Sequence, residues 1–336
     1  MADGTKIEWT DATVNAINGC SVVSPGCTNC YAMRLAGTRL KHHPSRAGLT
    51  TDSKAGPVWN GEVRLNEGQL LQPLRWAKPR RIFWNAHGDM FHPAVSDEWI
   101  DRCFAVMALT PQHIHQVLTK RADRMRDYFS SATQFRWISQ MKLIAKDFPR
   151  PQIVHPTSGG ALLQTKDQAL ENVWLGVSVE DQARADERIP HLLATPAAVR
   201  WLSCEPLLGP VRLDRIHETF DDGLAHSWES CLNGKRFDIW GEGENDGHPK
   251  VDWVVVGGES GKGARPMLAD WARSLRDQCS EAGTPFFFKQ WGAYLPCGQL
   301  NGDGGLWTNG SDHALLTTKS FAGRYLDGVQ HDGMPA

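Results

Sequence analysis

The sequence lacks any run of apolar residues that approaches the roughly 18 needed for a membrane-spanning helix. Residues 1–8 are polar and contain no apolar core of a secretory signal. An excess of charge of one sign is lacking as well, since 36 Lys and Arg residues oppose 38 Asp and Glu residues for a net charge of −2. We therefore expect a cytoplasmic protein without a membrane partner and without a global electrostatic attraction to nucleic acid.

Internal repeats, low-complexity tracts and a disulfide-like distribution of cysteine are also absent. Three of the eight cysteines crowd into eleven residues. In a reducing compartment this arrangement leaves thiols available to a metal. The 336 residues suffice for one barrel-sized domain or two ordinary ones. The bulk properties therefore indicate a globular, metal-dependent protein.

Short apolar runs rich in β-branched and aromatic residues recur along the chain. They are residues 81–86, 114–119, 173–179, 199–204, 251–257 and 285–290, with a weaker candidate at 13–17. Such runs are typical of strands covered on both faces, as in parallel sheets. Helix-like segments lie between them, at 96–109, 181–193 and 269–282. The alternation predicts an α/β fold.

The number of strands decides between the architectures of this class. Six or seven strands are too few for a complete eight-stranded barrel, so we expect a partial, TIM-like (β/α)6 barrel, with an open doubly wound sheet as the alternative. The barrel would occupy residues 1–297, with surface insertions at about 130–166 and 214–250. Residues 298–336 are expected to form a loop-rich C-terminal extension.

Polar side chains follow nearly every expected strand. They are His87, Asp89, Thr119, Lys120, Arg121, Ser178, Glu180, Asp181, Cys204, Glu205, Glu259, Ser260, Lys289 and Gln290. In parallel barrels the active site is built at the carboxyl ends of the strands. A strand has to end in polar residues for solvation alone, but six such ends in succession favour a functional site.

The three crowded cysteines are Cys20, Cys27 and Cys30, in the spacing C-x6-C-x2-C. The C-x2-C part lets two thiolates reach one metal, and Pro25-Gly26 supplies a bend that brings Cys20 round. Three thiolates suit a [4Fe–4S] cluster with one open iron. A structural zinc site is the alternative, with His42 or His43 as the fourth ligand.

Several longer segments carry a family resemblance. They are residues 6–13, 19–32, 88–93, 116–121, 172–180, 202–210, 256–261 and 286–292. Together they resemble the phage Gp37/Gp68 family (DUF5131), which is similar to radical S-adenosylmethionine (SAM) enzymes. The resemblance implies a three-Cys [4Fe–4S] cluster in a partial barrel. The open iron would bind SAM, and one electron from an electron donor would cleave SAM to a 5′-deoxyadenosyl radical.

The same resemblance suggests cofactor-binding residues. Gly257, Gly258 and Glu259 look like the Gly-Gly-Glu element that holds the amino group of SAM, although that element usually follows the second strand. Independently of the resemblance, Ser178 and Glu180 follow a middle strand, where they could meet a ribose or could equally serve to solvate the strand end. The usual cluster motif is C-x3-C-x2-C with an aromatic residue before the last Cys. Here the first gap is longer, and the aromatic residue, Tyr31, follows the last Cys.

Candidate catalytic residues lie at two strand ends. Cys204 beside Glu205 could donate a hydrogen atom to a product radical, although it could equally be a small buried residue. Asp89 could contact the cofactor or transfer a proton.

The substrate is not identified by the sequence. A nucleobase or nucleotide is a candidate, because basic residues such as Arg124 and Arg126 could bind phosphates and the 14 Trp could stack on a base. The basic run could equally be a solvated face. A non-catalytic phage accessory protein is the remaining hypothesis.

Overall fold

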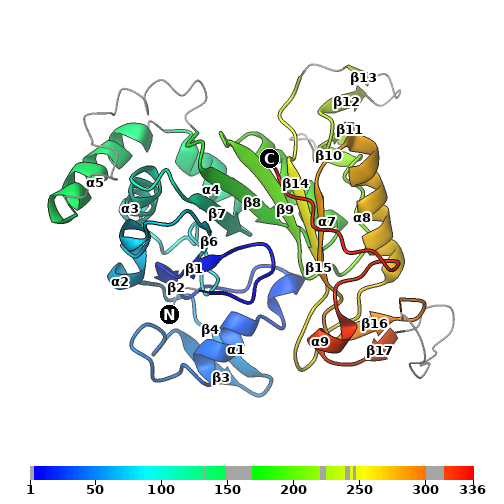
Figure 1. The fold of residues 1–336 in the computed structure, drawn as a ribbon, viewed down its shortest axis with the longest axis horizontal. Helices are drawn as coiled ribbons and strands as arrows, with labels where there is room; N and C mark the ends of the chain where they lie inside the picture. Colours follow the sequence, from blue (N-terminus) through cyan, green and yellow to red (C-terminus); the bar gives the residue numbers. More distant parts are fainter. Residues whose placement is uncertain are drawn as a thin grey trace. The chain divides into compact units, whose positions relative to one another are not determined.

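The computed structural model describes residues 4–131, 133–148, 169–219, 225–238, 243–244, 247–299 and 314–336. Its central sheet has seven strands in the order β1-β6-β7-β8-β9-β14-β15 (Figure 1). These strands are β1 (Ala12–Val14), β6 (Arg81–Trp84), β7 (Ile114–Thr119), β8 (Val173–Ser178), β9 (Val199–Cys204), β14 (Trp253–Gly257) and β15 (Phe286–Gln290). The pairs β1–β6, β6–β7, β9–β14 and β14–β15 are parallel. The topology is that of an α/β fold with a partial (β/α) barrel, as the sequence predicts.

The chain divides into two compact units. The first comprises Met1–Val23, Cys30–Gly176 and Thr195–Val199, and the second comprises Ser24–Asn29, Val177–Ala194 and Arg200–Ala336.

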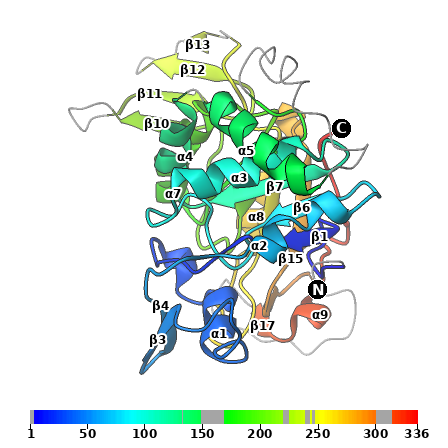
Figure 2. The same ribbon diagram turned by 90° about the vertical axis from the view of Figure 1, so that its left-hand side faces the viewer.

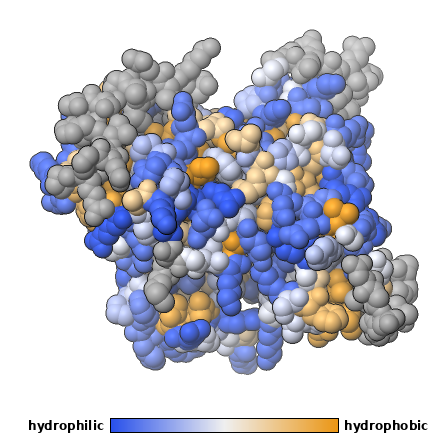
Figure 3. Space-filling model, in the orientation of Figure 1, coloured by the Kyte–Doolittle hydropathy of each residue, from blue (hydrophilic) through white to orange (hydrophobic). Residues whose placement is uncertain are grey.

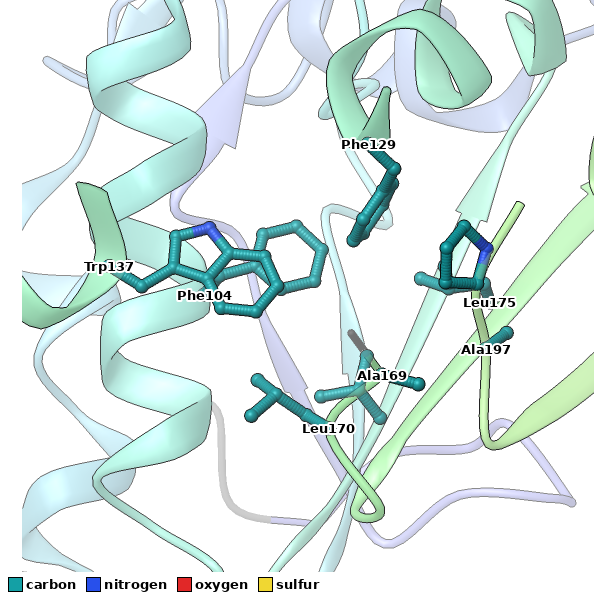
Figure 4. A pocket seen from close by; sticks show the side chains of 9 residues that line it. Phe104, Phe129, Trp137, Ala169, Leu170, Leu175 and Ala197 are labelled. Carbon is teal, nitrogen blue, oxygen red and sulfur yellow. The ribbon is translucent and has the colours of Figure 1, made fainter. Parts of the chain in front are cut away.

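In the first unit, three helices follow the early strands: α3 (Asp97–Ala108), α4 (Ala122–Phe129) and α5 (Thr133–Asp147). The Ser96 hydroxyl accepts a hydrogen bond from the Trp99 amide and so starts α3. Helix α5 packs on α3 (Figure 1). Phe104 and Trp137 stack with ring centroids 5.0 Å apart. Together with Leu170 and Leu175 they line a small apolar pocket (Figure 4).

The N-terminal part of the first unit adds a smaller layer. Its elements are β2 (Ile17–Asn18), α1 (Tyr31–Gly37), β3 (Thr50–Ser53), β4 (Gly56–Trp59), β5 (Arg64–Leu65), α2 (Glu67–Leu70) and the 3₁₀ turn η2 (Pro73–Arg75). Helix α1 packs against the β3–β4 hairpin (Figure 1). Met33, Ala36 and Trp59 are buried in that contact. The short apolar face of α1 is therefore covered directly after the third cysteine of the motif.

In the second unit, the later strands alternate with α7 (Gln182–Leu193) and α8 (Ala269–Ala282). Helix α8 ends at Gly283, whose φ of 68° is the left-handed conformation of a C-cap glycine, as expected. An antiparallel sheet, β10–β13, lies between β9 and β14 in the sequence, and Figure 2 shows it as a sheet of its own. Its strands are β10 (Ile216–Thr219), β11 (Ala225–Ser230), β12 (Lys235–Asp238) and β13 (Gly243–Glu244).

The C-terminal part of the second unit has regular structure within the expected extension. The hairpin of β16 (Tyr294–Pro296) with β17 (Ala314–Leu316) is followed by α9 (Lys319–Ala322). The indole of Trp253 on β14 donates a hydrogen bond of 2.7 Å to the Gly333 carbonyl. The chain end is thus bonded to the sheet of its own unit. The expected domain boundary at residue 297 stays a prediction.

The expected strands and helices are confirmed, with ends that differ by up to three residues. Helix α8 has the predicted bounds, and β14 starts at Trp253 rather than at Val251. In the first expected insertion, Thr133–Asp147 is a helix, while residues 149–166 lie outside the described ranges, as do residues 302–305 of the expected extension. Within the described residues, no helix combines the length and apolarity required to cross a membrane. Polar side chains cover much of the face in Figure 3, with small apolar patches between them.

A buried histidine makes the stability of the first unit dependent on pH. His115 on β7 is fully buried; its Nδ1 accepts a hydrogen bond of 3.0 Å from the Trp84 indole, and its Nε2 lies 3.0 Å from the Thr110 hydroxyl. Burial, followed by the charge of His113, lowers the pKa of His115 from 6.5 to about 3. Below pH 6.5, His115 binds a proton in the unfolded chain but stays neutral in the folded chain until the pH approaches 3. The free energy of unfolding therefore falls as the pH falls below 6.5.

We expect His115 alone to lower the free energy of unfolding by about 2 kcal/mol between pH 6.5 and about 5. Urea denaturation at several pH values measures this slope. A His115→Gln variant should show a flatter dependence, and an unchanged slope in that variant would contradict the assignment.

Candidate functional site

Within the described residues, the cysteines of the predicted cluster motif form no disulfide bond. Cys27 is buried, whereas Cys20 and Cys30 are half-buried. Cys20 and Cys30 belong to the first unit and Cys27 to the second. Across the described ranges, no three His, Cys, Asp or Glu side chains are gathered as ready-made metal ligands. The three-thiolate site therefore stays a prediction from the spacing.

The backbone before Cys20 is held close to the loop that follows β6. The Gly19 amide donates to the His87 carbonyl at 3.1 Å, and Gly19 forms a parallel bridge with Gly88. Gly19 has a φ of 95°, and a side chain there would collide with the Glu62 carbonyl. Only glycine fits this position without strain, so the sequence places Cys20 beside the end of β6.

The side chain of Arg121 contacts Cys20 in the first unit. Its Nη1 donates to the Cys20 sulfur at 3.6 Å and to Asp89 Oδ2 at 2.8 Å. Its Nη2 donates to the Ser21 hydroxyl at 2.8 Å and to the Ser21 carbonyl at 3.3 Å. The side chains of both Arg121 and Asp89 are only 7% exposed. Asp89, a catalytic candidate from the sequence, is thus linked to Cys20 through its buried ion pair with Arg121.

Asp89 accepts further hydrogen bonds that fix its carboxylate. The Thr119 hydroxyl donates to Oδ1 at 2.7 Å, the Phe91 amide to Oδ1 at 2.9 Å and the Lys120 amide to Oδ2 at 3.2 Å. Burial and then the charge of Asp89 raise the pKa of Cys20 to about 12, against the opposing effect of Arg121. Cys20 is consequently a neutral thiol in the metal-free protein, and a metal has to displace its proton.

Tyr31 lies beside His87 and Arg46 in the first unit. Its hydroxyl donates to the Ala86 carbonyl at 3.1 Å, and its ring meets His87 edge-on. Arg46 is 6% exposed and donates to His87 Nδ1 and to Ser45; within the described part of the chain none of its partners is a carboxylate. Burial, followed by Arg46, lowers the pKa of His87 to about 4, so His87 is neutral at pH 7. Arg46 stands in a loop without a motif, so no local sequence pattern indicates its place beside His87.

In the second unit, the segment that carries Cys27 is anchored by Glu180. This segment, Ser24–Asn29, contains the 3₁₀ turn η1 (Pro25–Cys27). The Ser24 hydroxyl donates to Glu180 Oε1 at 2.7 Å, and a side chain at Gly26 would collide with the Glu180 carboxylate. Arg188 donates to Glu180 Oε2 at 2.8 Å, and the two side chains are 2% and 0% exposed.

Glu259 anchors the other end of this segment. Asn29 Nδ2 donates to Glu259 Oε2 at 3.0 Å and to the Gly263 carbonyl at 2.7 Å. Arg265 donates to both oxygens of Glu259, at 2.7 and 2.9 Å, and to the Pro25 carbonyl at 3.0 Å. Burial opposes ionisation, but the hydrogen bonds from Arg265 and Asn29 lower the pKa of Glu259. Glu180 and Glu259, which follow β8 and β14, thus both hold the Cys27 segment.

Local packing explains the remaining cofactor candidates of the second unit. A side chain at Gly258 would strike the Trp291 carbonyl, and one at Gly257 would strike the Glu205 carboxylate. Ser178 is buried, and its carbonyl accepts a hydrogen bond of 2.8 Å from Arg188. The contacts at Gly257 and Gly258 account for these two glycines without a cofactor, and the cofactor-binding roles stay predictions.

The two catalytic candidates at the end of β9 differ in exposure. Cys204 is fully buried, and burial raises its pKa well above the ordinary value. Glu205 pairs with Lys289 at 3.0 Å, and its side chain is 14% exposed. Cys204 is therefore shielded in this conformation, whereas Glu205 reaches partly to solvent.

The basic run that suggested phosphate binding is largely paired with acids. Arg124 pairs with Asp97 at 2.9 Å, and Arg126 pairs with Asp127 at 2.7 Å. Together with the pairing of Arg121, these contacts neutralise most of the run. A phosphate would have to compete with each of them.

The family model described as a protein of unknown function (DUF5131) matches residues 4–335. The chain belongs to the DUF5131 family. No match to this DUF5131 protein was found among the curated proteins or among the solved structures. Family membership thus establishes relationship, and the chemistry has to be argued from the site.

Proposed function

We propose that this DUF5131 protein is a radical-SAM-like iron–sulfur enzyme. It would hold a [4Fe–4S] cluster through Cys20, Cys27 and Cys30 and use it to cleave SAM. The observation that carries the proposal is the anchoring of the Ser24–Asn29 segment by carboxylates at strand ends, Glu180 and Glu259. A cysteine segment bonded to the carboxyl ends of parallel strands lies where enzymes of this fold class place their chemistry.

The donor set fits such a cluster. None of the three thiols is tied up in a disulfide within the described residues, and three thiolates leave one iron of the cluster without a protein ligand. When bound, the cluster would supply the electron that cleaves SAM. An electron donor has to reduce it. Arg121 beside Cys20 offers the kind of outer hydrogen bond that supports a thiolate ligand.

The contacts of the candidate residues suggest how the roles divide. Both oxygens of Glu180 and of Glu259 are engaged, so these residues position the Cys27 segment. Binding of the SAM amino group by Glu259 would have to compete with Arg265. Tyr31, Ser178, Gly257 and Gly258 remain proposed SAM contacts. Glu205 and Cys204 remain proposed groups for the substrate, for which a nucleobase or nucleotide is the candidate.

Anaerobic reconstitution with iron and sulfide tests the metal. We expect about four iron and four sulfide per chain and a broad brown absorbance. Cys27→Ala should lose most of the iron, whereas Cys297→Ala, outside the motif, should load like the wild-type protein. Stoichiometric zinc without the brown absorbance would instead favour the structural zinc site.

Incubation of the reduced, loaded protein with SAM then tests catalysis. Release of 5′-deoxyadenosine supports the enzyme. A loaded protein that releases none under several reductants, with or without nucleotides, would favour a non-catalytic accessory protein.

A further inference from the structure

The position, the burial and the contacts of Arg121 are not explained by the proposed cluster alone. Arg121 stands two residues after the end of β7, its side chain is buried, and its two terminal nitrogens reach Asp89, Ser21 and the Cys20 sulfur. Sulfur is a weak acceptor, and a buried guanidinium has stronger acceptors available. The contact of 3.6 Å with Cys20 arises because the Asp89 carboxylate and the Ser21 hydroxyl together orient the guanidinium plane.

The orientation of this guanidinium is constrained on both sides. Thr119 and two backbone amides hold Asp89, and the Ser21 hydroxyl lies 3.0 Å from His92 Nε2. Rotation of Arg121 away from Cys20 would break its bonds to the residue that follows Cys20. The Nη1–H bond therefore stays directed at the sulfur.

We infer that Arg121 is a positioning residue that raises the reduction potential of the cluster through the sulfur of Cys20, and that Asp89 limits this effect. The inference rests on the proposed function. Reduction adds one electron, supplied by the electron donor, and makes the cluster more negative by one charge. A cation and an N–H donor at a ligand sulfur favour that reduced form, and a nearby carboxylate disfavours it.

The two partners should therefore shift the potential in opposite directions. Arg121→Gln removes the cation and leaves Asp89 beside the ligand, so the midpoint potential should become more negative. Asp89→Asn leaves Arg121 without its counter-charge, so the potential should become more positive. Arg121→Lys retains the charge without the fork geometry and should shift the potential less than Arg121→Gln.

Redox titration of the reconstituted protein, followed by electron paramagnetic resonance, measures these shifts. Arg124→Gln is the matched control, because Arg124 stands on α4 and contacts Asp97 and the Val95 carbonyl instead of the cysteine. It should leave the potential unchanged. Circular dichroism identifies any variant that does not fold, and the remaining variants of the set still decide the direction.

The outcomes separate the two proposals. A wild-type protein that takes up no cluster would overturn the proposed function and this inference with it. If the loaded protein has the wild-type midpoint potential in both Arg121→Gln and Asp89→Asn, the inference alone is overturned. A shift of the midpoint potential in the same direction in both variants would overturn it as well.

Discussion

Replacement of Glu180 by Ala is expected to lower the free energy of unfolding by about 3–5 kcal/mol, because it leaves a charge buried without its partner. The Arg188 side chain is 2% exposed, and without Glu180 its Nη1 retains, among the described residues, the Ser178 carbonyl as its acceptor. Water cannot easily replace a carboxylate at this depth. Urea denaturation followed by tryptophan fluorescence measures the loss.

The matched control removes both charges. A Glu180→Leu, Arg188→Met double variant should recover most of the stability, because no uncompensated charge remains. A single variant that is no more than about 1 kcal/mol less stable than the wild type would mean that the pair is solvated, contrary to its burial.

The same substitution should release the Cys27 segment. Ser24 loses its acceptor, and the Glu180 side chain no longer packs on Gly26. We expect faster hydrogen exchange over residues 24–29 and faster alkylation of Cys27 in the metal-free protein. The double variant should regain stability without regaining this protection, so the two readouts separate the stabilising role of Glu180 from its anchoring role.

Replacement of Gly258 by Ala is expected to cost about 3 kcal/mol or more, since the new methyl group would meet backbone atoms that cannot move independently. The obstacle is the Trp291 carbonyl, which follows β15. Gly258 also donates to the Gln290 carbonyl at 2.9 Å, and a side chain at Gly292 would in turn strike the Glu259 carbonyl. Two backbone segments therefore lie in direct contact at the ends of β14 and β15.

Gly257→Ala is the matched comparison within the same motif. Its methyl group would meet the carboxylate of Glu205, a flexible side chain that can swing away. We expect a cost of about 1 kcal/mol, with the weakening of the Glu205–Lys289 pair as its main cause. Thermal unfolding of both variants measures whether Gly258→Ala loses more stability than Gly257→Ala. Equal costs would show that the backbone at Gly258 relaxes more easily than its contacts imply.

Much of the fold is predictable from the sequence, because buried parallel strands carry a strong local signal. Residues 114–119 and 199–204 are apolar runs whose length matches a strand, and the structure gives β7 and β9 the same bounds. Helix α8 is equally well marked, since Gly283 terminates it in the left-handed conformation. The partial barrel follows from counting these segments.

The antiparallel sheet β10–β13 was not predictable in the same way. Its strands are two to six residues long and lie in a segment rich in Gly, Asp, Glu and His. These strands are determined by their pairing with neighbouring strands of the sheet, and the sequence shows no regular alternation of apolar and polar residues that would mark them.

For the site, the sequence named candidate positions but could not give their partners. Glu180 and Glu259 were expected to contact a cofactor, which stays a prediction, and the structure shows that both hold the cysteine segment. Asp89 was expected to contact the cofactor or transfer a proton, which also stays a prediction, and its carboxylate pairs with Arg121. Each of these pairings joins residues far apart in the chain, and the choice among several acceptors depends on burial and geometry that no local pattern encodes.

The anchoring of the Cys27 segment also couples positions of this chain that lie far apart in the sequence. Ser24 and Glu180 are 156 positions apart, and Asn29 and Glu259 are 230 positions apart, yet each pair shares one hydrogen bond. A change at one member leaves its partner's polar group without that bond, so a substitution at one position also affects the other. The long first gap of the cysteine motif then has a use of its own: it provides the room in which Ser24, Pro25 and Gly26 meet their distant partners.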